Sequence, residues 1–98
     1  MQRKLQQIFI KLRKLLPTIK EQYNVKEIEV FGSYVRSEEN SKSDLDLLVT
    51  FTITPSLLQF VNLKNFLSDK LELEVDLVMR ESVKPYLFEN ILKETLPV

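Results

Sequence analysis

The chain has 98 residues, of which 44% are hydrophobic and 29% are charged, and this composition fits one small folded domain over residues 1–98. It contains no cysteine and no histidine, which excludes disulfides, thiolate chemistry and the usual zinc ligands. Any bound metal must therefore be held by oxygen, which favours Mg²⁺ or Mn²⁺. No apolar run can span a bilayer and no signal core is present, so we expect no membrane association and a cytoplasmic protein.

Charge is unevenly distributed, although the formal net charge is zero. The first twenty residues contain no acidic side chain and six basic ones: Arg3, Lys4, Lys11, Arg13, Lys14 and Lys20. This segment could face nucleic acid, a nucleotide or an acidic partner. The simpler interpretation is the solvated face of an amphipathic helix.

In the first third of the chain, apolar residues recur at helical spacing over residues 3–15, which predicts a helix. Pro17 is expected to interrupt it, with a short second helix over 18–23 that Asn24 ends. Residues 26–31 are rich in β-branched side chains and predict a strand that ends at Gly32.

A helical turn is expected over 34–37 and a polar loop over 38–43. The strongest predicted strand covers 45–51, and a helix over 55–70 should begin at Thr54-Pro55. A third strand over 73–78, a turn over 82–85 and a last helix over 86–94 follow. The predicted fold class is α+β, with helices covering one face of a small mixed sheet.

Gly32 is the only glycine in the chain. A glycine that closes a strand and opens a helical turn lets backbone N–H groups approach an anion closely. Ser33 adds a hydroxyl donor, and Arg36, one turn further on, could bind the same phosphate. The pattern predicts a phosphate-binding turn, although Gly-Ser after a strand is usually only a turn, and Arg36 could instead pair with Glu38 or Glu39 in water.

Asp44 and Asp46 fall on one face of the predicted strand 45–51, roughly 6.5 Å apart along it. Two carboxylates at such a short distance repel each other unless a cation lies between them. Asp76 can join them if strand 73–78 pairs beside strand 45–51, and three carboxylates suit two-metal phosphoryl or nucleotidyl transfer. Taken singly, Asp-x-Asp could be a surface loop and Asp76 a solvent-facing strand residue, but the joint pattern favours a site.

Gly32-Ser33, ten intervening residues and Asp44-Leu45-Asp46 resemble the GSx10DxD signature of the minimal nucleotidyltransferases (MNT), members of the DNA polymerase β-like superfamily. The likeness covers nearly the whole chain, including EVDLVMRESVKPYLFENILKE around Asp76. It implies a polymerase β-like palm fold, ATP as the substrate and two Mg²⁺ ions. Asp44, Asp46 and Asp76 would be catalytic metal ligands, and Gly32, Ser33 and Arg36 would bind the nucleotide. Ser37 departs from the glycine that many relatives carry there.

The resemblance also implies a partner. Such proteins are often encoded beside HEPN ribonuclease toxins, and the antitoxin transfers AMP to a tyrosine of the toxin and silences it. The expected function is thus a protein adenylyltransferase antitoxin. Two alternatives stay open: a catalytically silent antitoxin that acts by binding alone, and a nucleic-acid module that uses the basic residues 3–20, which we rank last.

Overall fold

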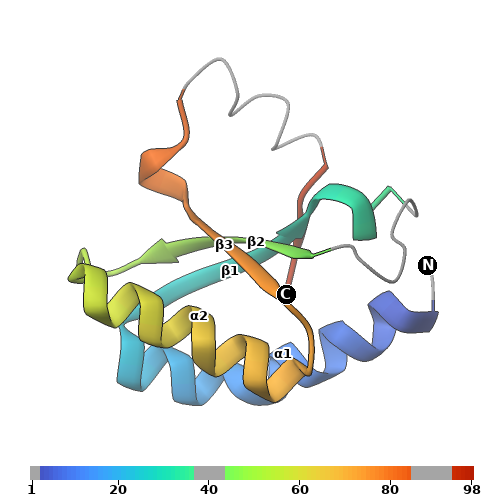
Figure 1. Ribbon diagram of the computed structural model, residues 1–98, viewed down its shortest axis with the longest axis horizontal. Coiled ribbons are helices and arrows are strands. Elements are labelled where there is room, and N and C mark those ends of the chain that lie inside the picture. Colours follow the sequence, from blue (N-terminus) through green and yellow to red (C-terminus); the bar gives the residue numbers. More distant parts are fainter. Residues whose placement is uncertain (1–2, 37–43, 85–93) are drawn as a thin grey trace.

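The computed structural model describes residues 3–36, 44–84 and 94–98. Two long helices, α1 (Arg3–Tyr23) and α2 (Leu57–Leu71), lie on the same side of a four-stranded sheet (Figure 1). The strands are β1 (Val25–Phe31), β2 (Leu45–Phe51), β3 (Val75–Met79) and β4 (Leu96–Pro97). This confirms the predicted α+β class, with helices on one face of a small mixed sheet.

The sheet has the order β3-β2-β1-β4. β1 runs antiparallel to β2 and β4, whereas β2 and β3 are parallel and are joined through α2. The pairing of the second and third predicted strands, on which the place of Asp76 in the site depended, is therefore present. β3 begins two residues later than predicted, and β4, which has two residues, was not predicted.

Helix α1 is continuous through Pro17, so the predicted break into two helices is wrong. Pro17 is exposed, while Leu12 and Ile19 on either side of it are fully buried. The proline therefore lies on the solvent side, where water can satisfy the carbonyl group that its missing N–H leaves without a donor. The helix ends where predicted, at Asn24, whose φ of 55° is the left-handed conformation of a helix stop.

Helix α2 begins later than predicted because Ser56, rather than Thr54, caps it. The Ser56 hydroxyl accepts a hydrogen bond from the Gln59 N–H, and the Gln59 side chain accepts one from the Ser56 N–H. This capping box satisfies two backbone donors at the helix start. At the other end, Glu72 adopts φ 56° and turns the chain toward β3.

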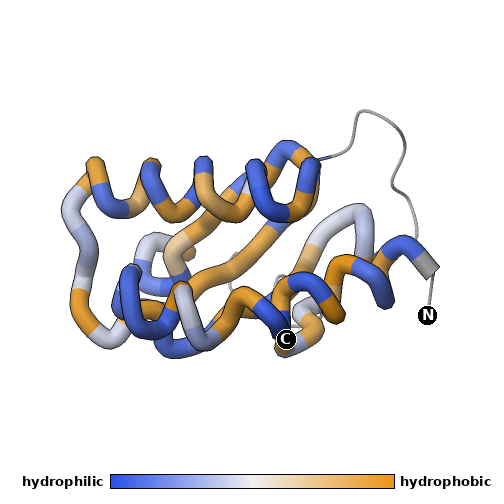
Figure 2. The backbone as a smooth tube through the Cα atoms, turned by 90° about the horizontal axis from the view of Figure 1, so that it is seen from below, coloured by the Kyte–Doolittle hydropathy of each residue, from blue (hydrophilic) through white to orange (hydrophobic). Residues whose placement is uncertain are grey.

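One apolar core fills the space between the helices and the sheet (Figure 2 colours the backbone by hydropathy). β2 contributes Leu45, Leu47, Val49 and Phe51, as its alternation predicted, and leaves Asp46 and Thr50 on the far side. A domain of this size depends on such burial, at about 25 cal/mol for each Å² of apolar surface. The face of the sheet away from the helices thus carries Asp46 and Thr50, together with Leu48, which is 2% exposed.

Two predictions fall on residues that the structure does not describe. They are the polar loop over 38–43 and all but the last residue of the helix over 86–94. The turn after β3 is a 3-10 turn, η2 (Arg80–Ser82), which comes earlier than the predicted turn over 82–85 and shares only Ser82 with it. Within the described residues, no helix is long and apolar enough to cross a membrane.

Candidate active site

The turn that follows β1 is held by its own backbone and by the core. Gly32–Tyr34 forms the 3-10 turn η1, and the N–H groups of Val35 and Arg36 donate to the Gly32 carbonyl at 3.1 and 3.2 Å. The Tyr34 side chain is 1% exposed and packs in the core, with Lys4 Nζ 5.4 Å from its ring centre. The helical turn therefore starts at Gly32, two residues before its predicted position.

Gly32 and Asp46 lie in contact across β1 and β2. Gly32 adopts φ +82°, a conformation that side chains rarely allow. A β-carbon at this position would lie 2.9 Å from the carboxyl carbon of Asp46 and closer still to its Oδ2. Position 32 therefore requires glycine for two independent reasons. The first is its positive φ, and the second is the clash of any side chain with the Asp46 carboxyl group, which was predicted to bind a metal.

Asp46 and Asp76 are register partners on the parallel strands β2 and β3. Partners in a sheet share a face, so both carboxyl groups lie on the side away from the helices. The pKa of Asp46 is raised to about 6, mainly by burial and then by the negative charge of Asp76, a hydrogen bond between the two carboxyl groups and the charge of Asp44. The structure thus brings two of the three predicted acids together, at a place where a cation would relieve their repulsion.

Asp44 lies one residue before β2 and is exposed. It is near enough for its charge to act on Asp46, but among the described residues no group of three acidic side chains converges closely enough to hold a metal ion. The donors present are all carboxylate oxygens, which suit Mg²⁺ or Mn²⁺. The residues fit a divalent cation in chemistry, with Asp46 and Asp76 as its first two ligands and Asp44 as the available third.

Arg36 lies beside the acid pair. It lines an open hollow of about 390 Å³ together with Phe31, Gly32, Asp46, Asp76, Val78 and Glu94. Its positive charge lowers the pKa of Asp46, against the larger effects that raise it. Its guanidinium also forms an ion pair of 2.8 Å with Glu94, a partner that the sequence did not reveal. Glu38 and Glu39, the partners considered from the sequence, lie outside the described residues.

Ser33 is partly buried in the turn and is not among the residues that line this hollow. The sequence-predicted set is therefore only partly assembled: Gly32, Arg36, Asp46 and Asp76 share one hollow, Asp44 is adjacent, and Ser33 is beside Gly32. Phe31 and Glu94 are lining residues that sequence reasoning missed. Phe31 could have been found from its place before Gly32, whereas Glu94 gave no signal.

Other acids on the same sheet face already have a cation. Arg80 lies 3.6 Å from a carboxylate oxygen of Glu29 and 3.9 Å from one of Glu27. This separates the two glutamates of β1 from Asp46 and Asp76, which repel each other. The acid pair is consequently the part of this face where a metal would neutralise the most charge.

Comparison with known proteins places the chain in a family. The nucleotidyltransferase domain family matches residues 12–98. Protein adenylyltransferase MntA of Thermococcus cleftensis is 46% identical over 80 residues, which cover 82% of this chain and 81% of that protein. A solved structure of the minimal nucleotidyltransferase class superposes with a TM-score of 0.79 at 33% identity and covers 94% of both chains. A toxin–antitoxin crystal structure with AMP-PNP superposes with a TM-score of 0.73 at 26% identity, over 89% of this chain and 68% of that one.

The fold is that of a minimal nucleotidyltransferase. The chain belongs to the nucleotidyltransferase domain family, because that family matches most of its length. It is therefore a nucleotidyl-transferring enzyme, and the name of its relative makes AMP transfer the reaction class.

Proposed function

We propose that this protein is a Mg²⁺-dependent protein adenylyltransferase that transfers AMP from ATP to a tyrosine of a HEPN ribonuclease toxin and so neutralises it. The observation that carries the proposal is the register pair Asp46 and Asp76 beside the Gly32 turn. A scaffold that acted by contact alone would gain nothing from two carboxyl groups that repel each other. The toxin–antitoxin structure with AMP-PNP at 26% identity supports both the nucleotide and the kind of partner.

Each site residue then has an assigned role. Asp44, Asp46 and Asp76 would hold two Mg²⁺ ions, and the ions would supply charge neutralisation for the phosphates and the leaving pyrophosphate. The Gly32–Ser33 turn would hold the triphosphate close to the backbone, and Arg36 would donate to its oxygens. The whole of residues 1–98 would act as one catalytic domain in the cytoplasm, with nucleic acid not required.

The reaction that follows is a balanced group transfer. The tyrosine oxygen forms a bond to the α-phosphorus of ATP while the bond from that phosphorus to the pyrophosphate oxygen breaks. The tyrosine hydroxyl proton leaves to a carboxylate or to water, and pyrophosphate departs. The protein contributes by aligning the two reactants and by placing charge around them, which is how phosphoryl-transfer enzymes obtain most of their rate.

The test uses the protein, a HEPN protein as the candidate acceptor, ATP labelled at the α-phosphate, and Mg²⁺. Wild type should label the partner on tyrosine, as located by mass spectrometry, and Asp46→Asn should not. Asp69→Asn is the matched control, since Asp69 is an exposed carboxylate of α2 outside the hollow. Equal labelling by wild type and Asp46→Asn, or none by wild type, would contradict the proposal.

The alternative of a silent binding antitoxin makes the opposite prediction in cells. If binding alone neutralises the toxin, a chain that carries both Asp44→Asn and Asp46→Asn still protects cells from it. Loss of protection together with unchanged complex formation would support the enzymatic account.

A further inference from the structure

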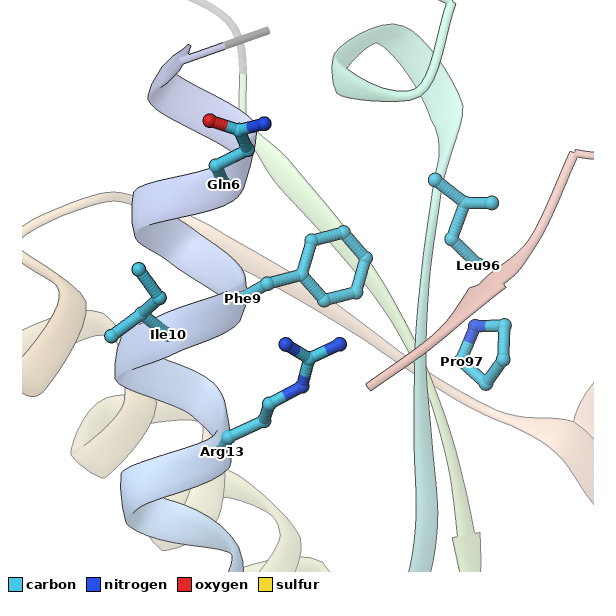
Figure 3. Close-up of a pocket in the computed structure, with 6 residues that line it drawn as sticks. All are labelled: Gln6, Phe9, Ile10, Arg13, Leu96 and Pro97. Atoms are coloured by element: carbon cyan, nitrogen blue, oxygen red, sulfur yellow. The ribbon is translucent and has the colours of Figure 1, made fainter. Parts of the chain in front are cut away.

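A groove lies between helix α1 and the edge strand β4. It has a volume of about 450 Å³ and is lined by Gln6, Phe9, Ile10, Arg13, Leu96 and Pro97. Figure 3 shows Phe9 and Arg13 reaching from the helix toward β4. Ile10 is 53% exposed although it is a large apolar residue. The groove therefore offers apolar surface to water, which is a property of docking sites.

The charge of the groove is positive. Helix α1 carries basic residues along its length and its first acid is Glu21. The Arg13 guanidinium lies over the Phe9 ring, 5.5 Å from its centre, and no carboxylate of the described residues forms an ion pair with it. A carboxylate brought against Arg13 beside this apolar floor would be only partly screened by water, and the pair would gain more than a fully exposed one.

The strand at the groove edge is closed to a further strand. Val98 donates its N–H to Ile28, and the register of β4 on β1 leaves position 97 with its backbone facing outward. Position 97 is proline, which has no N–H to offer an added strand. The occupant that fits is thus a helix laid into the groove through its side chains.

The groove and the candidate active site share no lining residue, but residues that are close in the chain line both of them. Leu96 pairs with Val30, and the next residue of β1, Phe31, pairs with Asp46. The segment 94–97 lines both places, with Glu94 in the acidic hollow and Leu96 and Pro97 in the groove. A protein held in the groove would therefore contact β4, two residues along the chain from Glu94 of the acidic hollow.

We propose that the groove between α1 and β4 docks a helix of the acceptor protein, one that presents apolar side chains next to an aspartate or glutamate. This inference rests on the proposed function in taking the acceptor to be a protein. The competing surface is the apolar patch Ile53, Leu57, Leu58 and Val61 at the start of α2. That patch follows the C-terminal end of β2, roughly 16 Å of strand away from Asp46, and carries no charge to select a partner.

The absence of cysteine allows a direct test. Ile10→Cys and Leu58→Cys each place one thiol at an exposed apolar position, in the groove and in the patch respectively. The rate of maleimide labelling of each variant is measured with and without the HEPN acceptor protein. The expected result is at least a tenfold slowing at position 10 and less than twofold at position 58. Slowing at position 58 alone, no slowing at either, or slowing at position 10 in the isolated protein as its concentration rises would overturn the proposal, the last because the occupant would be a second copy.

A charge reversal separates this inference from the proposed function. Arg13→Glu should raise the Kd of the complex about 10- to 100-fold, which is the loss in affinity expected when a partly buried charge pair is broken. Lys14→Glu, which makes the same change on the next residue of α1, should weaken it less than threefold. Asp46→Asn should bind like wild type while transferring no AMP. Equal binding by Arg13→Glu and wild type would overturn the proposal that the groove is the docking site. A complex that depends on Arg13 but transfers no AMP would overturn the enzymatic proposal alone.

Discussion

The Asp46 carboxyl group occupies the space that a side chain at Gly32 would need. A β-carbon at Gly32 would lie 3.1 Å from the β-carbon of Asp46 and 2.9 Å from its carboxyl carbon. The backbone of the turn and the carboxyl group of the strand are thus fitted to each other. Four predictions about the site and one about α1 follow from this fit and from the contacts around it.

Gly32→Ala should destabilise the fold and remove AMP transfer. The alanine must take φ +82° and push the Asp46 carboxyl group aside, and we expect a loss of about 1–3 kcal/mol in the free energy of unfolding. Chemical denaturation measures this. The double variant that also carries Asp46→Ala no longer has a carboxyl group in the way of the alanine. Its loss in the free energy of unfolding should therefore be smaller, by about 0.5–3 kcal/mol, than the sum of the losses of the two single variants. Additive losses would show that the two residues do not compete for space.

Asp46→Asn should stabilise the protein most at high pH. The pKa of Asp46 is raised from 3.8 to about 6 in the folded chain, with burial as the main cause. Between these values the folded state binds more protons than the unfolded state, so wild-type stability falls as pH rises from about 4 to about 6. The Tm difference between Asp46→Asn and wild type should grow over that window. Asp69→Asn is the control, and a difference that does not change with pH would contradict the prediction.

Mg²⁺ should raise the Tm of the wild-type protein at pH 8. That pH lies above the raised pKa of Asp46, about 6, and a divalent cation would relieve the repulsion between the Asp46 carboxylate and the negative charge of Asp76. The shift should disappear in Asp76→Asn, and a monovalent salt of equal ionic strength should not reproduce it. Equal shifts in both proteins would place the bound ion elsewhere.

Glu94→Gln and Arg36→Gln should have different effects although they break the same ion pair. The pair is 2.8 Å long but its side chains are 42% and 36% exposed, so either change should alter stability by less than about 1 kcal/mol. Arg36→Gln should raise the KM for ATP about tenfold, because the donor to phosphate is lost. Glu94→Gln should leave that KM unchanged or lower it. Identical KM values for wild type, Arg36→Gln and Glu94→Gln would show that Arg36 does not bind the nucleotide.

Pro17→Ala should stabilise helix α1 without touching the site. Pro17 is exposed inside the helix and lacks the N–H of an internal residue, and alanine restores one hydrogen bond. The expected gain is about 1–3 kcal/mol in the free energy of unfolding, less the entropy that proline removes from the unfolded chain. AMP transfer should be unchanged. A loss of stability would mean that the proline ring itself packs usefully.

The parts of the fold that were predictable are those in which one short stretch carries all the information. The strand over 45–51 was predicted with its observed bounds, because its alternation and the position of Asp46 agree. The pairing that places Asp76 beside Asp46 was only a condition of the predicted site, because no local pattern determines which strands pair. In contrast, Pro17 gave a break that the structure does not have, since burial of residues on both sides outweighs a local steric signal.

What could not be predicted depends on contacts between distant residues. β4 has two residues and exists only through its hydrogen bonds to β1, so no local pattern marks it. The ion pair of Arg36 joins residues 58 positions apart. The start of α2 was a different kind of error, because Ser56 and Gln59 are a recognisable capping box that was overlooked in favour of Thr54-Pro55.

The parallel pairing of β2 with β3 also sets when the site can exist during synthesis. Asp46 leaves the ribosome thirty residues before Asp76, and the two meet only after α2 has formed and the crossover has closed. A nascent chain that ends before β3 carries the glycine turn and the first aspartates but lacks their counterpart. The acid pair of the candidate site is therefore completed by the addition of a single strand, β3.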